Sequence, residues 1–475
     1  MRLVYQNAAE VSVWLGPEDD KSVLAWKLMK DIEDCQRDMA AIRELIEPMR
    51  EVQFTALEAL FQREYFWRIW VVQEIACAKN AVVYCGSESM PWQDLLNVGN
   101  IMEKVRDTLR DSIYHNKPAM LFSLMSGGPK NLKIATSSIV PFSENMAPPL
   151  LDLLRSHMGK GATDPHDKVY GLVGISADRT SFGRINYERS PRATFVYTAR
   201  HIISTTNKLD VICPQQNDDN RYLLPSWVPD WERRNLYLSH RVVPLHVRRP
   251  YFAASRSESA KATFAEDGEV LRARGFVVDT ITTVAQPLYV DGPESEVSPT
   301  LKAFHNWWTV FVNNIGIKKA DIFQQTFLSG AWAPDYSDFE KDLSQRLTFF
   351  FGLTKKLIPG LLKDGYPIPG LKRDDTIALE VLEAREYAMV SSAALRMHAK
   401  RFIVSSTKLA GLAPQAAEEG DKIVVLLGCD VPVVMRKTDT YWTLIGEIYV
   451  DGIMYGEAMD GLFSRKYYER TFDIR

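Results

Sequence analysis

Residues 65–76 have the sequence YFWRIWVVQEIA, which places Gln73 and Glu74 inside one of the most apolar runs of the chain. If one helix covers this run, Trp67, Trp70 and Glu74 share a face, because residues three and four apart on a helix are neighbours. An ionised carboxylate is costly to bury without partners, so Glu74 must be hydrogen-bonded within the fold or open to a ligand cleft. The run therefore predicts either a structural carboxylate or a site, and the residues alone leave the two about even.

Short apolar runs on both sides of this segment are typical of buried strands, because each is followed directly by a glycine. Between and after them the apolar residues recur with helical periodicity. The order strand, helix, helix, strand, helix is typical of a parallel α/β sheet. We expect strands at residues 11–15 and 81–85 and helices at about 20–34, 55–79 and 92–109.

The middle of the chain predicts further helices. Asp164 is typical of an N-cap and Pro165 of a first helical position. A second helix is expected near residues 191–206. The prolines of residues 224–231, LPSWVPDW, exclude a central strand or helix, so we expect an extended segment held by its two tryptophans.

The last part of the chain predicts a return to strands. A half-buried strand is expected at residues 270–279, and a helical insertion with a loop in its middle at about residues 297–400. Glycine and aspartate turns then separate four runs, at residues 422–427, 431–436, 441–450 and 453–459, which predict an antiparallel meander.

These patterns predict an α/β fold with a partial parallel sheet, followed by an α+β region with a helical insertion and a C-terminal antiparallel β meander. A length of 475 residues suggests two or three domains. We expect them at residues 1–100, at 101–250, which are mostly helical, and at 251–475.

The balance of charge excludes some classes of partner. With 57 basic and 60 acidic residues the formal net charge is −3, so nothing indicates binding to nucleic acid or to an anionic membrane. No signal peptide and no run of about 18 apolar residues is found, so we expect no membrane span and a cytoplasmic location.

The metal-ligating residue types show no recognisable spacing. The histidines never form a His-Glu-x-x-His pattern, and no Cys-x-x-Cys pair occurs. An odd number of scattered cysteines fits a reducing compartment. We therefore expect neither a metal nor a cofactor. Residues 171–174, GLVG, lack the third glycine of a dinucleotide fingerprint. The cysteines are Cys35, Cys77, Cys85, Cys213 and Cys429.

Several of these pieces, taken in order, resemble the fungal heterokaryon-incompatibility (HET) domain family. The N-terminal pieces are Tyr5-x-x-Ala8, residues 11–16 (VSVWLG), residues 68–75 (RIWVVQEI), and Val83-x-Cys85-Gly86 with Trp92 after it. Residues 164–172, 225–231 and 411–457 resemble the region that commonly follows the domain.

The resemblance implies a role in non-self recognition and programmed cell death, built on a domain related to Toll/interleukin-receptor (TIR) domains. In enzymatic TIR domains a glutamate on a helix cleaves the nicotinamide–ribose bond of NAD. By the resemblance, Glu74 is the candidate catalytic carboxylate and Trp70 a pocket wall, with NAD as substrate and not as cofactor. A carboxylate can offset the charge of the oxocarbenium-like centre that forms at the ribose.

One departure bears on this expectation. HET domains usually begin with two motifs that this sequence does not contain, so we expect the chain to lack the N-terminal part of the domain and the strand at residues 11–15 to be an exposed edge. Two alternatives remain. In the first, the intact protein cleaves NAD and this chain is an inactive fragment of it. In the second, the chain acts without catalysis, through other incompatibility proteins or through self-association.

Overall fold

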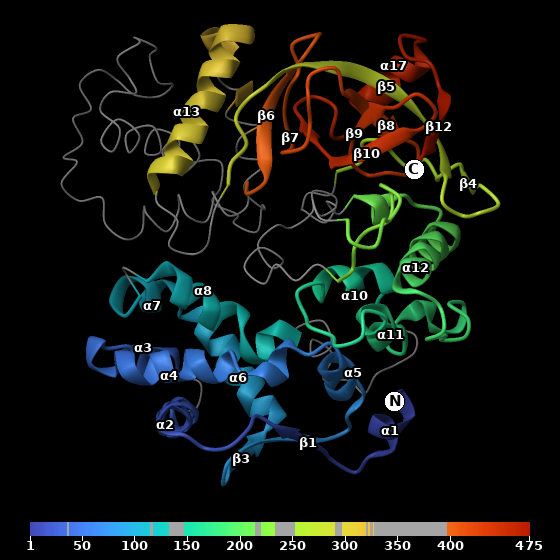
Figure 1. Cartoon of the computed structure of the whole chain (residues 1–475). Helices are drawn as coiled ribbons and strands as arrows, with labels where there is room; N and C mark the ends of the chain where they lie inside the picture. Colours follow the sequence, from blue (N-terminus) through green and yellow to red (C-terminus); the bar gives the residue numbers. More distant parts are fainter. Residues whose placement is uncertain are drawn as a thin grey trace, which may run out of the picture. The chain divides into compact units, whose positions relative to one another are not determined.

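The computed structural model describes residues 1–35, 38–114, 117–132, 147–213, 220–232, 252–289, 297–319, 322–323, 326 and 397–475. The chain divides into two compact units, of which the first is built mainly from residues 1–188 and the second begins at Arg189 and includes the C-terminal sheet. Figure 1 labels the helices and strands of both.

The first unit contains a three-stranded sheet in the order β1-β2-β3. β1 (Val11–Trp14) pairs in parallel with β2 (Ala81–Cys85), which confirms both predicted strands and their parallel pairing. β3 (Glu88–Pro91) returns antiparallel to β2 through the turn at Gly86, whose φ is 58°. β1 is the edge strand as expected, and Trp14 on it is 54% exposed.

Helices cover this sheet and form most of the first unit. α2 (Asp20–Asp34) matches its predicted range, because Asp19 and Ser22 form a capping box at its start. α2 packs against α4 (Glu51–Phe61) through apolar faces. Further helices of this unit are α1 (Arg2–Asn7), α3 (Met39–Glu44), η1 (Pro48–Arg50), α6 (Trp92–Lys104), α7 (Arg106–Ser112), α8 (Pro118–Ser126), η3 (Gly128–Leu132), α10 (Leu150–Ser156), α11 (Asp167–Val173) and η5 (Ala177–Thr180).

The prediction of one helix over residues 55–79 is wrong. The segment divides into α4, η2 (Glu64–Trp67) and α5 (Trp70–Cys77), and Arg68 between the last two has an extended backbone. Gly161 causes the break, since its N–H donates to the Trp67 carbonyl at 2.6 Å and its carbonyl accepts from the Ile69 N–H at 2.9 Å. These bonds replace helical ones, so Trp67 does not lie on the helix that carries Trp70 and Glu74.

The second unit is built around a nine-stranded sheet. Its longest strand, β5 (Leu271–Val284), pairs with β12 (Arg470–Ile474) on one side and with β8 (Lys422–Leu426) on the other. The path β5-β12-β10-β9-β8 returns to β5, so five strands close a ring. The remaining strands are β4 (Ala262–Phe264), β6 (Lys400–Ser405), β7 (Ala410–Pro414), β9 (Val433–Lys437), β10 (Trp442–Glu447) and β11 (Tyr449–Val450).

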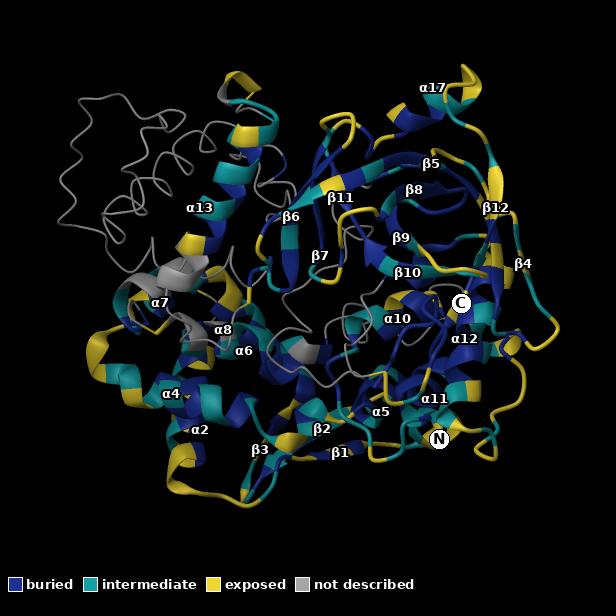
Figure 2. Cartoon of the chain, turned by 45° about the horizontal axis from the view of Figure 1, so that its top comes forward, coloured by how far each residue is buried: buried dark blue, intermediate teal, exposed yellow. Residues whose placement is uncertain are grey.

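Apolar side chains fill this ring. Phe276, Val425, Val434 and Ile448 belong to one core cluster and are fully buried. The strands β8 and β9 are buried along most of their length, as Figure 2 shows. The predicted antiparallel meander is confirmed from β8 through β9 to β10.

The predicted strand at residues 453–459 is wrong, because α17 (Glu457–Phe463) begins within it. Gly452 and Gly456 have φ values of 83° and 91°, which favour turns over an extended strand. Of the predicted helical insertion, the structure describes α13 (Val297–Asn314) and η8 (Ile317–Lys319), whereas residues 327–396 lie outside the described part.

α12 (Pro191–Thr206) also belongs to the second unit and matches its predicted range, with Ser190 as N-cap. After it comes η6 (Asp210–Ile212). Residues 224–231 contain neither helix nor strand, as their prolines predict, and Trp227 and Trp231 are buried. Among the described residues, no helix is both long and apolar enough to cross a bilayer.

Candidate functional site around Glu74

α5 carries both predicted site residues, Trp70 at its start and Glu74 one turn later. Its buried residues Val71, Val72 and Ile75 fix the helix between α1 and α11. Trp70 and Glu74 are half-buried, so each has one side in the protein and one toward solvent.

Two tyrosines lie next to the Glu74 carboxylate. The Tyr65 hydroxyl donates to Glu74 Oε2 at 3.4 Å, and the Tyr5 hydroxyl lies near enough for the Glu74 charge to act on it. Burial and then the Glu74 charge raise the pKa of Tyr5 to about 12, and the same causes raise the pKa of Tyr65 further. Both phenols therefore stay neutral at physiological pH.

Two arginines precede Glu74 in the segment that leads to α5, and one of them lies near the site. The positive charge of Arg68 acts on both tyrosines and opposes the rise in their pKa. Arg63 lies elsewhere, because its guanidinium donates to the carbonyls of Leu15 and Pro17 and pairs with Asp19 at 2.9 Å. Arg63 thus anchors the turn that follows β1.

Trp70 is held by a different acid. Its indole N–H donates to Asp167 Oδ2 at 2.9 Å, and the Tyr187 hydroxyl donates to Asp167 Oδ1 at 2.7 Å. Burial, followed by Asp167, raises the pKa of Tyr187. The sequence did not single out Asp167 as a site residue, although this residue belongs to the 164–172 segment that carries the family resemblance. The α-helix itself begins at Asp167, not at Pro165 as predicted, because the turn before it is closed by bonds between residues three apart, from the Asp167 N–H to the Asp164 carbonyl and from the Lys168 N–H to the Pro165 carbonyl. The Asp164 side chain does accept from the backbone N–H of His166 at 3.0 Å, as an N-cap does.

A buried lysine, which the sequence did not reveal, supports the segment before α5. Lys160 is 1% exposed, and its Nζ donates to the Phe66 carbonyl at 2.6 Å. Burial, followed by the charge of Lys168, lowers the pKa of Lys160 to about 7. Lys168 donates in turn to the carbonyls of Met158 and Lys160. The two lysines thus connect the backbone before α11 to η2.

The glycines of residues 171–174 serve helix packing. A Cβ on Gly174 would lie 2.1 Å from the Gln73 Nε2 atom, and a Cβ on Gly171 would lie 3.4 Å from Ile69. Gln73 is buried, and its Oε1 has no hydrogen-bond partner in the described part of the chain. The close approach of α11 to α5 thus explains Gly174 without a nucleotide.

The arrangement offers a carboxylate beside two neutral phenols, of which Tyr65 donates to it, and an adjacent indole oriented by a second carboxylate. A pocket of about 540 Å³ lies in the second unit, and no residue of the Glu74 segment contributes to it. Its lining residues are Arg192, Asn220, Tyr222, Leu223, Leu224, Pro225, Ser226, Glu269, Thr443 and Arg475.

Comparisons with known proteins match both ends of the chain. Residues 1–74 match the family model described as heterokaryon incompatibility protein (HET), and residues 374–469 match the Het-6 beta-barrel domain. The chain is 24% identical to the heterokaryon incompatibility protein 6, OR allele, of Neurospora crassa, over 97% of this chain and 78% of that protein. No solved structure matches. The resemblance to the heterokaryon-incompatibility family is confirmed.

Proposed function

We propose that this chain is a non-self recognition protein of a filamentous fungus, which acts in the cytoplasm and has programmed cell death as its output. The similarity to heterokaryon incompatibility protein 6 along 97% of the chain carries the proposal, because it includes both the HET segment and the ring of strands. Its partners are other incompatibility proteins or a second copy of the chain.

The surroundings of Glu74 favour action by association over catalysis. Tyr65 donates to its carboxylate from within the fold, Tyr5 lies beside it, and Asp167 accepts from the indole of the neighbouring Trp70. A side chain that is hydrogen-bonded within the fold is typical of a structural position.

The test deletes the gene in isolates of the fungus that carries it. We expect at least one pair of isolates that abort fusion to form a stable heterokaryon after deletion, and reintroduction of the gene to restore the abortion. Vital-dye uptake in fused cells measures the death response. If every pairing behaves as before the deletion, the proposal is wrong.

NAD cleavage on a TIR-like domain is the second candidate, and the partial exposure of Glu74 beside Trp70 favours it. A carboxylate at this place would stabilise positive charge at the ribose, and an indole would stack on the nicotinamide. The Tyr65 hydroxyl would orient the carboxylate.

One variant separates the two candidates. Glu74→Gln retains the shape of the side chain and an oxygen acceptor for Tyr65 but removes the charge. If Glu74 is catalytic, cells that carry this variant in the reintroduction assay should lose both the killing response and NAD consumption. The thermal stability of the variant protein should be unchanged. If the protein acts by association, cells that carry the variant should still die after fusion. Their total NAD should equal that of wild-type cells until they lyse.

A further inference from the structure

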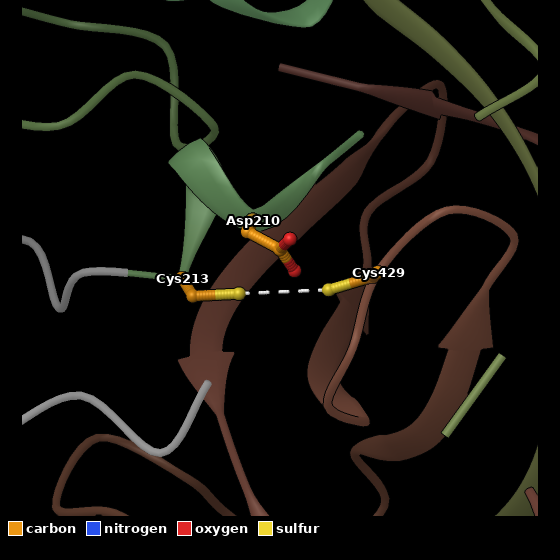
Figure 3. A group of neighbouring side chains, drawn as sticks. All are labelled: Asp210, Cys213 and Cys429. Atoms are coloured by element: carbon orange, nitrogen blue, oxygen red, sulfur yellow. Dashed lines mark hydrogen bonds between the residues drawn. The ribbon is translucent and has the colours of Figure 1, made fainter. Parts of the chain in front are cut away.

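Three potential metal ligands meet in the second unit. Asp210 and Cys213 lie at the two ends of the short turn that contains η6, and Cys429 lies in the turn after β8 (Figure 3). The two sulfurs are 3.5 Å apart although the residues are separated by 216 positions. The ligand atoms of all three residues lie within 4.8 Å of one another.

This spacing suits a tetrahedral ion. Two thiolates at about 2.3 Å from Zn²⁺ are separated by about 3.8 Å when the angle between them is tetrahedral. The observed 3.5 Å therefore needs little adjustment. A disulfide would need the sulfurs to approach to about 2.05 Å, well below the observed separation.

Hydrogen bonds hold the two turns in register. The Leu209 N–H donates to the Gly428 carbonyl at 2.8 Å, and the Asp430 N–H donates to Asp210 Oδ1 at 2.9 Å. The second bond orients the Asp210 carboxylate, as an outer partner commonly does for a metal ligand. A carboxylate has two oxygens and can accept this bond and still coordinate.

All three side chains lie in the interior of the second unit. Cys213 and Cys429 are fully buried, and Asp210 is 9% exposed. A bound divalent ion would stabilise the thiolate form of the two cysteines.

We propose that Asp210, Cys213 and Cys429 bind a divalent thiophilic metal of the zinc class, which joins the turn after α12 to the turn between β8 and β9. Two thiol protons are released to solvent as the ion enters, and the three ligands with the ion then carry one net negative charge. Three protein ligands leave the fourth position for water or a further oxygen donor.

The test uses the full chain, purified without chelator and loaded with Zn²⁺ or Co²⁺. We expect one metal per chain by elemental analysis, and for Co²⁺ the intense near-ultraviolet absorption of thiolate-to-cobalt charge transfer. Cys213→Ser and Cys429→Ser should each lose the metal. Cys35→Ser, a half-buried cysteine of the first unit, is the matched control and should keep it. Asp210→Asn keeps the acceptor for the Asp430 N–H and should bind at least about tenfold more weakly.

Two results would overturn the proposal. One is wild-type protein with five titratable thiols that takes up no Co²⁺ and shows no charge-transfer band. The other is a Cys213–Cys429 disulfide in protein isolated without reductant, recognised by a mass lower by two hydrogens. The wild-type cobalt spectrum decides the question even if the serine variants fail to fold.

Discussion

Lys160 illustrates at the residue scale how a buried charge in this fold depends on pH. Its pKa falls from 10.5 to about 7 on folding because it is buried and lies near Lys168. The unfolded chain therefore binds more protons than the folded one between these values, so this group makes the protein more stable as the pH rises from 7 toward 10.

We expect Lys160→Met to remove this dependence. As the pH rises from 7.5 to 9.5, the unfolding free energy of the wild type should increase relative to that of the variant. The gain should be up to about 1.4 kcal/mol per pH unit. Urea denaturation at several pH values measures it. Parallel pH profiles for the two proteins would show that Lys160 titrates normally in the fold.

The hydrogen bond between Trp70 and Asp167 gives a second prediction at this scale. Trp70→Phe keeps an aromatic ring and removes the 2.9 Å bond to the carboxylate, so we expect a loss of about 1.5–3 kcal/mol of stability. Tyr187→Phe removes the other donor from a residue that is 49% exposed and should cost less. Equal losses for both variants in urea denaturation would contradict a special role for the indole.

At the scale of single elements, β5 depends on Gly275. It pairs with β8 on one side and β12 on the other, and a Cβ at this position would lie 2.3 Å from the Val425 carbonyl oxygen. Backbone atoms in a ladder cannot move aside cheaply. We expect Gly275→Ala to cost more than about 2 kcal/mol, whereas Arg272→Ala, on an exposed position of the same strand, should cost under about 1 kcal/mol. Thermal denaturation of the two variants compares them.

The elements also show what the sequence could and could not predict. Local signals sufficed for α2 and β2, where a cap or a terminal glycine marks the boundary. They failed at Arg68, because the helix is interrupted by Gly161, a partner distant in sequence. The same limit applies to the candidate site: periodicity places Trp70 and Glu74 one turn apart, but only the fold brings Asp167, Tyr5 and Tyr65 to them. It applies equally to Cys213 and Cys429, which share no spacing motif.

At the scale of the whole molecule, the chain has two compact units, each with a sheet and buried apolar residues of its own. Chains of this length commonly depart from a single cooperative transition. We therefore expect two calorimetric transitions. Trp70→Phe, in the first unit, should shift one of them, and Gly275→Ala, in the second, should shift the other. If both variants shift one shared transition, the two units unfold cooperatively. The stability of one unit could then not be measured separately from that of the other.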